Sequence, residues 1–130
     1  MDWLSIFGWQ KQQLDDIRFV GFCYIKEGHY EIGVSFFKAL IAINPKNIYD
    51  NQILGAIYLE TGKYQDALKQ LEIALRLDPI HLPTLLNRAK ALFSLGRSDQ
   101  GIKQAKALLV CKDKKIVHQA EALLIAYIPK

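Results

Sequence analysis

The sequence predicts an all-α protein in which pairs of helices repeat along the chain. Three observations lead to this prediction. Pro45 and Pro79 each follow an Asn or Asp and stand 34 residues apart. Small and aromatic residues recur at the same step, and the apolar residues between them follow the helical period of about 3.6 residues. The length of 130 residues is enough for about one domain of this kind.

The recurring residues have separate mechanical roles in each helix pair. One set lies inside the first helix, where a residue without bulk lets the second helix approach closely. Another set follows that helix, at a left-handed cap that favours glycine. The two prolines then end the second helix of the first two pairs. The sets are Gly21, Gly55 and Ala89; Tyr24, Tyr58 and Leu92; Gly28, Gly62 and Gly96; Tyr30, Tyr64 and Ser98; and Gly33, Ala67 and Gly101.

Seven helices are expected from this spacing, with the last one acting as a cap. An array of repeats needs its open end covered, and the apolar face of the final helix, from Ala120 through Leu124 to Tyr127, is expected to lie on the third pair. The expected ranges are 12–27, 30–43, 47–61, 64–77, 82–95, 98–111 and 115–127.

In these residues the chain resembles the tetratricopeptide-repeat family. The second repeat carries the family pattern most fully, in Leu54-Gly55, Tyr58, Ala67, Leu71, Ala74 and Pro79. The first repeat departs from it at Gly33 and Leu40, and the third has Arg88, Leu92, Ser98 and Asp113 at positions where the family prefers other residues. The resemblance implies a right-handed superhelix of about three helix pairs. Its parts would be an apolar N-terminal segment (1–11), three repeats within 12–113 (14–45, 48–79 and 82–113) and a C-terminal capping helix (114–130).

The resemblance also implies that the first helices of the pairs line a concave groove that binds a partner. Five apolar residues of the groove have no evident role in the core, so we expect it to suit an amphipathic helix or an apolar segment. These five are Phe22, Ile25, Leu59, Leu86 and Phe93. The alternative is that some of them pack beneath the N-terminal segment or the capping helix. The full set of expected partner-binding residues is Arg18, Phe19, Phe22, Ile25, Tyr49, Gln52, Ile53, Ala56, Leu59, Leu86, Asn87, Lys90 and Phe93.

A short three-repeat protein with an apolar groove resembles the bacterial type III secretion chaperones. The branch that holds a needle subunit together with a small helical cochaperone fits the length best. We therefore expect a non-catalytic cytoplasmic protein that keeps a secreted helical subunit soluble, as part of a homo- or hetero-oligomer. The alternative is a general adaptor or assembly scaffold, including a cochaperone that binds C-terminal peptides. Arg18, Asn87 and Lys90 are outnumbered by apolar neighbours, which disfavours a carboxylate clamp.

The first nine residues contain five large apolar side chains that need cover: Trp3, Leu4, Ile6, Phe7 and Trp9. This segment is expected either to cap the first repeat or to form a second interface. Asp2 stands where a secretory signal would be positively charged, and no apolar stretch is long enough to cross a membrane. Both features predict a cytoplasmic protein that does not insert stably into a membrane.

Charge and residue spacing argue against nucleic-acid binding and catalysis. The net charge is only +4, and the densest basic run, Lys112 to Lys115, is interrupted by Asp113, so we interpret it as a solvated loop. Cys23 and Cys111 form no CxxC pair, the three histidines are scattered, and the glycines form no phosphate-binding cluster. We therefore expect no catalytic residue, metal or cofactor.

Overall fold

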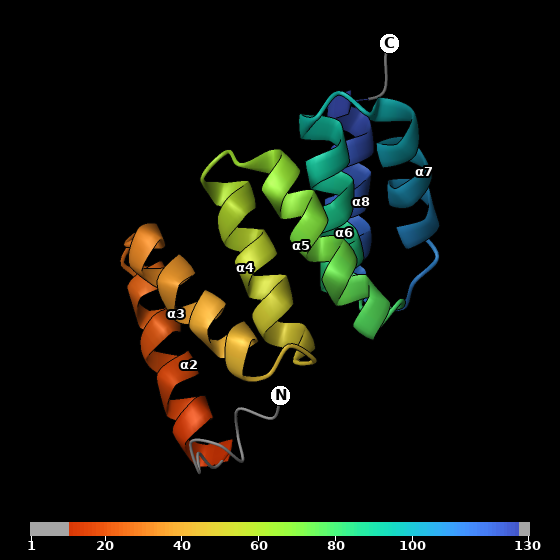
Figure 1. Ribbon diagram of the computed structural model, residues 1–130. Helices are drawn as coiled ribbons and strands as arrows, with labels where there is room; N and C mark the ends of the chain where they lie inside the picture. Colours follow the sequence, from red (N-terminus) through yellow and green to blue (C-terminus); the bar gives the residue numbers. More distant parts are fainter. Residues whose placement is uncertain (1–10, 128–130) are drawn as a thin grey trace.

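The computed structural model describes residues 11–127, and this range is a stack of helices without strands (Figure 1). Three helix pairs, α2/α3, α4/α5 and α6/α7, follow one another, and α8 lies beside the third pair. The predicted all-α class is confirmed, and every helix begins and ends within three residues of its expected limits. The helices are α2 (Lys11–Lys26), α3 (Tyr30–Ile43), α4 (Ile48–Glu60), α5 (Tyr64–Leu77), α6 (Leu82–Ser94), α7 (Ser98–Leu108) and α8 (Lys114–Tyr127).

The turn inside each pair depends on a glycine in the left-handed region. Gly28, Gly62 and Gly96 have φ angles of 83°, 77° and 76°, a conformation that other residues adopt with strain. In the second pair the N–H of Lys63 then donates to the carbonyl of Tyr58 at 2.8 Å and closes the last turn of α4. The predicted glycine caps are therefore confirmed.

Close contact within a pair depends on residues that lack bulk. A Cβ atom added to Gly55 would lie 2.7 Å from Cδ2 of Leu71, and one added to Gly21 would lie 2.9 Å from Cβ of Phe36. These distances are shorter than real contacts, and Leu71 is fully buried, so its side chain has little room to move. The first and second helices of these pairs consequently meet at the predicted positions.

The buried apolar side chains form three clusters along the stack. The first lies between α2, α3 and α4, the second between α5 and α6, and the third between α6, α7 and α8. Ala120 and Leu124 of α8 belong to the third cluster, as predicted for a capping helix. Asp113 starts this helix, because its Oδ1 accepts the backbone N–H groups of Lys115 and Ile116 at 3.0 and 3.3 Å.

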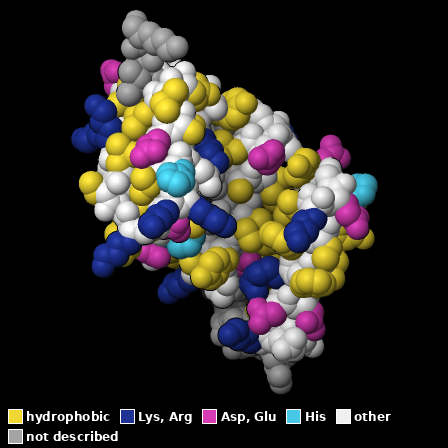
Figure 2. Space-filling view, turned by 180° about the vertical axis from the view of Figure 1, so that it is seen from behind, with side chains coloured by type: hydrophobic (Ala, Val, Ile, Leu, Met, Phe, Trp, Pro, Cys, Tyr) yellow, Lys and Arg dark blue, Asp and Glu magenta, His cyan; other side chains and the backbone are white. Residues whose placement is uncertain are grey.

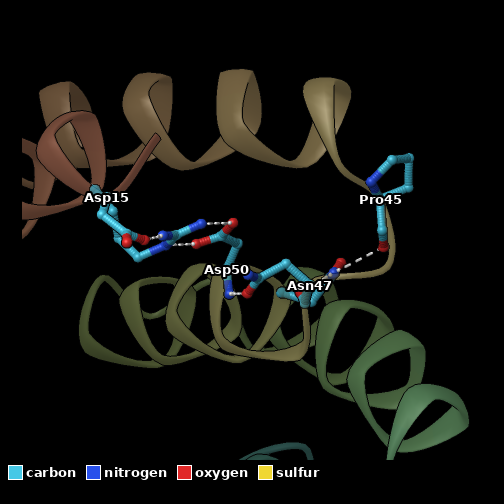
Figure 3. Close-up of polar contacts among 6 residues, drawn as sticks. Asp15, Pro45, Asn47 and Asp50 are labelled. Carbon is cyan, nitrogen blue, oxygen red and sulfur yellow. Dashed lines mark hydrogen bonds and ion pairs between the residues drawn. The ribbon is translucent and has the colours of Figure 1, made fainter. Parts of the chain in front are cut away.

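An ion pair joins the first helix pair to the second (Figure 3). Arg18 of α2 donates from Nε and Nη2 to the two carboxylate oxygens of Asp50 of α4, at 2.5 and 2.8 Å. The Asp50 side chain is fully buried, while that of Arg18 is 20% exposed and also pairs with Asp15 at 2.7 Å. The hydrogen bond to Asp50 raises the pKa of Arg18 above its usual value. The two-pronged contact fixes the distance between α2 and α4.

The turn before α4 holds Asp50 in position for this contact. Oδ1 of Asn47 accepts the backbone N–H of Asp50 at 3.0 Å and so caps α4. Nδ2 of Asn51 donates to the carbonyls of Pro45 and Asn47, and its Oδ1 accepts from Gln70 at 2.5 Å. Figure 3 shows Asn47 beside Asp50, with Pro45 in the turn that precedes them. The buried amide thus ties the turn to α5.

Replacing Gly55 with leucine should destabilise the protein by about 2–3 kcal/mol, which is roughly 10 °C in melting temperature, because the new side chain would overlap Leu71. Ala39→Leu is the matched control, since it adds a similar side chain to an exposed position of α3. Thermal melting of both variants, followed by circular dichroism, tests this. Equal midpoints for the two variants would contradict the close contact at Gly55.

Arg18→Ala should destabilise the protein by about 3 kcal/mol, because it leaves the buried carboxylate of Asp50 without a partner. Asp50→Asn should have a smaller effect of about 1 kcal/mol, since Arg18 is partly exposed and keeps Asp15. The double variant should therefore be more stable than Arg18→Ala alone. Asp15→Asn is the control, because it removes only the exposed contact.

Chemical denaturation of the four variants would measure these differences. A group whose pKa is higher in the folded state stabilises the fold fully at pH values below its pKa in the unfolded chain. This contribution is lost only as the pH rises through its pKa in the folded state. The contribution of Arg18 should therefore stay constant from neutral pH to about pH 10. A double variant that is less stable than Arg18→Ala would contradict the assignment.

Candidate functional site

A cleft of about 350 Å³ lies between α4, α6 and α8 and is the centre of the candidate site. Figure 2 shows a hollow with hydrophobic side chains between the part of the molecule that α2 to α4 form and the part that α6 to α8 form. The cleft combines apolar walls with a few charged and polar groups. Its lining residues are Ala56, Leu59, Glu60, Tyr64, Asn87, Lys90, Ser94, Leu123 and Tyr127.

Three aromatic residues of the predicted groove are exposed on α2 and α4. The exposed fractions are 68% for Phe19, 41% for Phe22 and 59% for Tyr49. The ammonium group of Lys26 lies 5.5 Å from the centre of the Phe22 ring, within the range of a cation–π contact. Exposed aromatic side chains of this kind suit the apolar side chains of a partner.

Leu86 and Phe93 were expected to face a partner, and this prediction is wrong because both are buried in the third core cluster. The Phe93 ring fills the space that Gly101 leaves, since a Cβ there would lie 2.9 Å from it. Its ring also stacks on Tyr127, with centroids 4.5 Å apart. The capping helix therefore uses these side chains as core contacts, which is the alternative that the sequence left open.

Ile25 and Leu59 also have core contacts that the sequence did not indicate. Ile25 lies 2.6 Å from the place where a Cβ of Gly33 would be, so it packs against the second helix of its own pair. Leu59 packs against the second cluster, and Ile53 packs against the first. Of the five apolar residues expected to lack a core role, Phe22 alone is classed as exposed.

Four predicted residues line the cleft itself, namely Ala56, Leu59, Asn87 and Lys90. Gln52 lies beside them along α4 and is partly buried. Arg18 is committed to Asp50 and Asp15, so its role is to hold α2 against α4.

The sequence analysis did not assign the residues that α8 adds to the cleft, Leu123 and Tyr127. Tyr127 was expected to lie on the third pair, and it does contact Phe93 there. Its 44% exposed fraction leaves part of the ring facing the cleft. The apolar face of the last helix indicated that it makes a contact. The sequence did not give the curvature of the helix stack, which decides that this face also lies opposite α4.

Other predictions concern the N-terminal segment, metal binding and membrane insertion. The expected second interface, Trp3, Leu4, Ile6, Phe7 and Trp9, lies outside the described residues. Among residues 11–127, no three His, Cys, Asp or Glu side chains are close enough to hold a metal ion. Within the same range no helix has both the length and the apolar character that a membrane span needs.

Known proteins of the same shape share little sequence with this chain. No curated protein matches its sequence. The structure of PcrH in complex with the chaperone binding region of PopD has a TM-score of 0.82 and 22% identity, covering 92% of this chain and 93% of that one. PcrH from Pseudomonas aeruginosa gives 0.80 and 21%, covering 91% and 93%. The first tetratricopeptide-repeat domain of Spaghetti (RPAP3), bound to an HSP90 peptide, gives 0.79 and 16%, covering 92% and 97%.

The family model described as tetratricopeptide repeat matches residues 51–81. This range contains Gly55, Tyr58, Ala67 and Pro79, the residues on which the resemblance was most complete. Residues 51–81 therefore match the tetratricopeptide-repeat model, and the described residues have the fold of tetratricopeptide-repeat proteins.

Proposed function

We propose that this protein binds a segment of another polypeptide in its concave face and has no catalytic chemistry of its own. Two observations carry the proposal: Phe19, Phe22 and Tyr49 are exposed on α2 and α4, and a cleft lies between α4, α6 and α8. Apolar side chains that a helix pair does not use for its own core are available to cover the apolar face of a partner.

The two parts of the concave face differ in chemistry. The side of α2 and α4 presents aromatic rings, whereas the cleft contains Lys90, Glu60 and Asn87 among its apolar walls. A partner segment with an apolar anchor at one end and polar or charged side chains at the other fits this arrangement. An amphipathic helix or an extended segment would satisfy both parts.

Within this proposal, the role we favour is a cytoplasmic chaperone of type III secretion that keeps a secreted helical subunit soluble, with or without a small cochaperone. Three short repeats, an aromatic groove wall and the likeness to PcrH bound to a region of PopD support it. The runner-up is an adaptor for C-terminal peptides. Asn87 and Lys90 in the cleft and the likeness to the RPAP3 domain bound to an HSP90 peptide favour that alternative.

Phe22→Glu combined with Tyr49→Glu should abolish binding of the native partner while helicity and melting temperature stay nearly unchanged. The introduced carboxylates remain hydrated in the free protein but would have to be desolvated in the complex, at a cost of several kcal/mol. Leu59 is unsuitable for this test because it packs against the second core cluster. Co-purification from the native cell, with mass spectrometry and circular dichroism on the same samples, measures both outcomes.

The matched control is Ile32→Glu combined with Ile73→Glu. These residues have exposed fractions of 42% and 39%, close to the value for Phe22, but lie on α3 and α5, the second helices of their pairs. The control should bind the partner normally. Loss of binding in the control, or full binding by the groove variant, would place the partner on another surface. A secreted helical protein in the purified complex would support the chaperone, and heat-shock proteins would support the adaptor.

A further inference from the structure

A second surface lies where the α5–α6 turn and the α7–α8 turn come together. It borders the groove at His81, whose ring centre lies 5.9 Å from that of Tyr49. Leu82 and Leu85 at the start of α6 pack against the third core cluster. Leu109 and Cys111 of the α7–α8 turn pack against the same cluster. Figure 1 shows the two turns side by side on one edge of the stack. The edge at the opposite ends of the helices carries the glycine turns. We call the first surface the α5–α8 turn edge, formed by residues 76–81 and 106–115.

Two aliphatic side chains project from this edge. The exposed fractions of Ile80 and Val110 are 79% and 87%, the highest of any large hydrophobic side chain in residues 11–127. Both stand in turns that hydrogen bonds hold in place. The N–H of Ile80 donates to Oδ1 of Asp78 at 3.2 Å, and the N–H of Cys111 donates to the carbonyl of Leu108 at 3.2 Å. The turns themselves therefore present these side chains to the surroundings.

The same edge carries an excess of positive charge. It contains five basic residues, Arg76, Lys106, Lys112, Lys114 and Lys115, but only two acidic ones. Both acidic side chains accept backbone N–H groups in the turns, and none of the five basic groups is in an ion pair within residues 11–127. Figure 2 shows several Lys and Arg side chains on the left of the molecule, with acidic and His side chains among them.

The glycine-turn edge has the opposite balance. Residues 26–31, 60–66 and 94–99 contain three basic and five acidic residues. Charge is thus separated between the two edges of the stack, and the two most exposed aliphatic side chains lie on the basic one. The basic run from Lys112 to Lys115 by itself suggested only a solvated loop, but the exposed aliphatic side chains beside it indicate a contact surface.

We propose that the α5–α8 turn edge docks on an anionic membrane surface. Lysines near such a surface are attracted to its phosphate and carboxylate headgroups, and short aliphatic side chains between them can enter the interface. The phosphates of a nucleic acid would use the same lysines but gain little from Ile80 and Val110. The contact uses side chains of the two turns, and within residues 11–127 no helix could span the bilayer.

Sedimentation with vesicles of phosphatidylcholine, made with and without phosphatidylserine, tests the proposal on the full chain. The protein should bind only the vesicles with phosphatidylserine and should be released by high salt. Replacing Lys112, Lys114 and Lys115 together with glutamine should lower partitioning by roughly a hundredfold, about fivefold for each charge. Ile80→Ser combined with Val110→Ser, which leaves the charge unchanged, should lower it by about tenfold.

The control replaces Lys26, Lys63 and Arg97 with glutamine, which removes the same charge from the glycine-turn edge. It should change partitioning by no more than about twofold, because those groups lie beyond the screening length of the contact. Equal losses in the two charge variants would overturn the proposal. So would equal binding to vesicles without phosphatidylserine. Full vesicle binding by the serine variant, together with displacement by a homopolymeric RNA, would assign the edge to nucleic acid instead.

Discussion

The positions at which the first helix of a pair carries no bulky side chain determine much of this structure. At Gly21 and Gly55 the second helix comes so close that a Cβ atom would overlap Phe36 or Leu71. Ala89, the corresponding residue of the third pair, is fully buried. The apolar residues at and around these contacts form the three core clusters, each of which also extends to the next pair or to α8. The concave face consists of what these contacts leave exposed.

The parts of the fold that local rules govern could be predicted from the sequence. A left-handed turn needs glycine whatever surrounds it, so Gly28, Gly62 and Gly96 marked the end of the first helix in each pair. The 34-residue step then placed all seven helices within residues 11–127. Even Asp113, which departs from the family pattern, has a local role as the cap of α8.

The predicted groove was less accurate because its residues depend on neighbours in other helices. Their positions in the repeat place Phe93 and Phe22 on similar faces of their helices. Yet α8 covers the ring of Phe93, whereas within the described residues no helix covers the ring of Phe22. Two of the wrongly predicted groove residues could have been recognised from the sequence, because a glycine inside a helix leaves a space that a large side chain must fill. Gly33 and Gly101 are such residues, and their partners are Ile25 and Phe93. Arg18 had no such signal, because Asp50 lies 32 residues away in the sequence.

The division of the core into three clusters has a consequence for motion. In a linear array each unit depends on its immediate neighbours, so opening of one unit need not spread to the rest. The first cluster is connected to the remaining pairs through α4 alone, and the ion pair of Arg18 with Asp50 joins α2 to that helix. The aromatic wall formed by Phe19 and Phe22 therefore belongs to the unit that can separate most independently. Opening at that end would change the width of the groove at Phe19 and Phe22, whereas the third cluster holds α8 to α6 and α7.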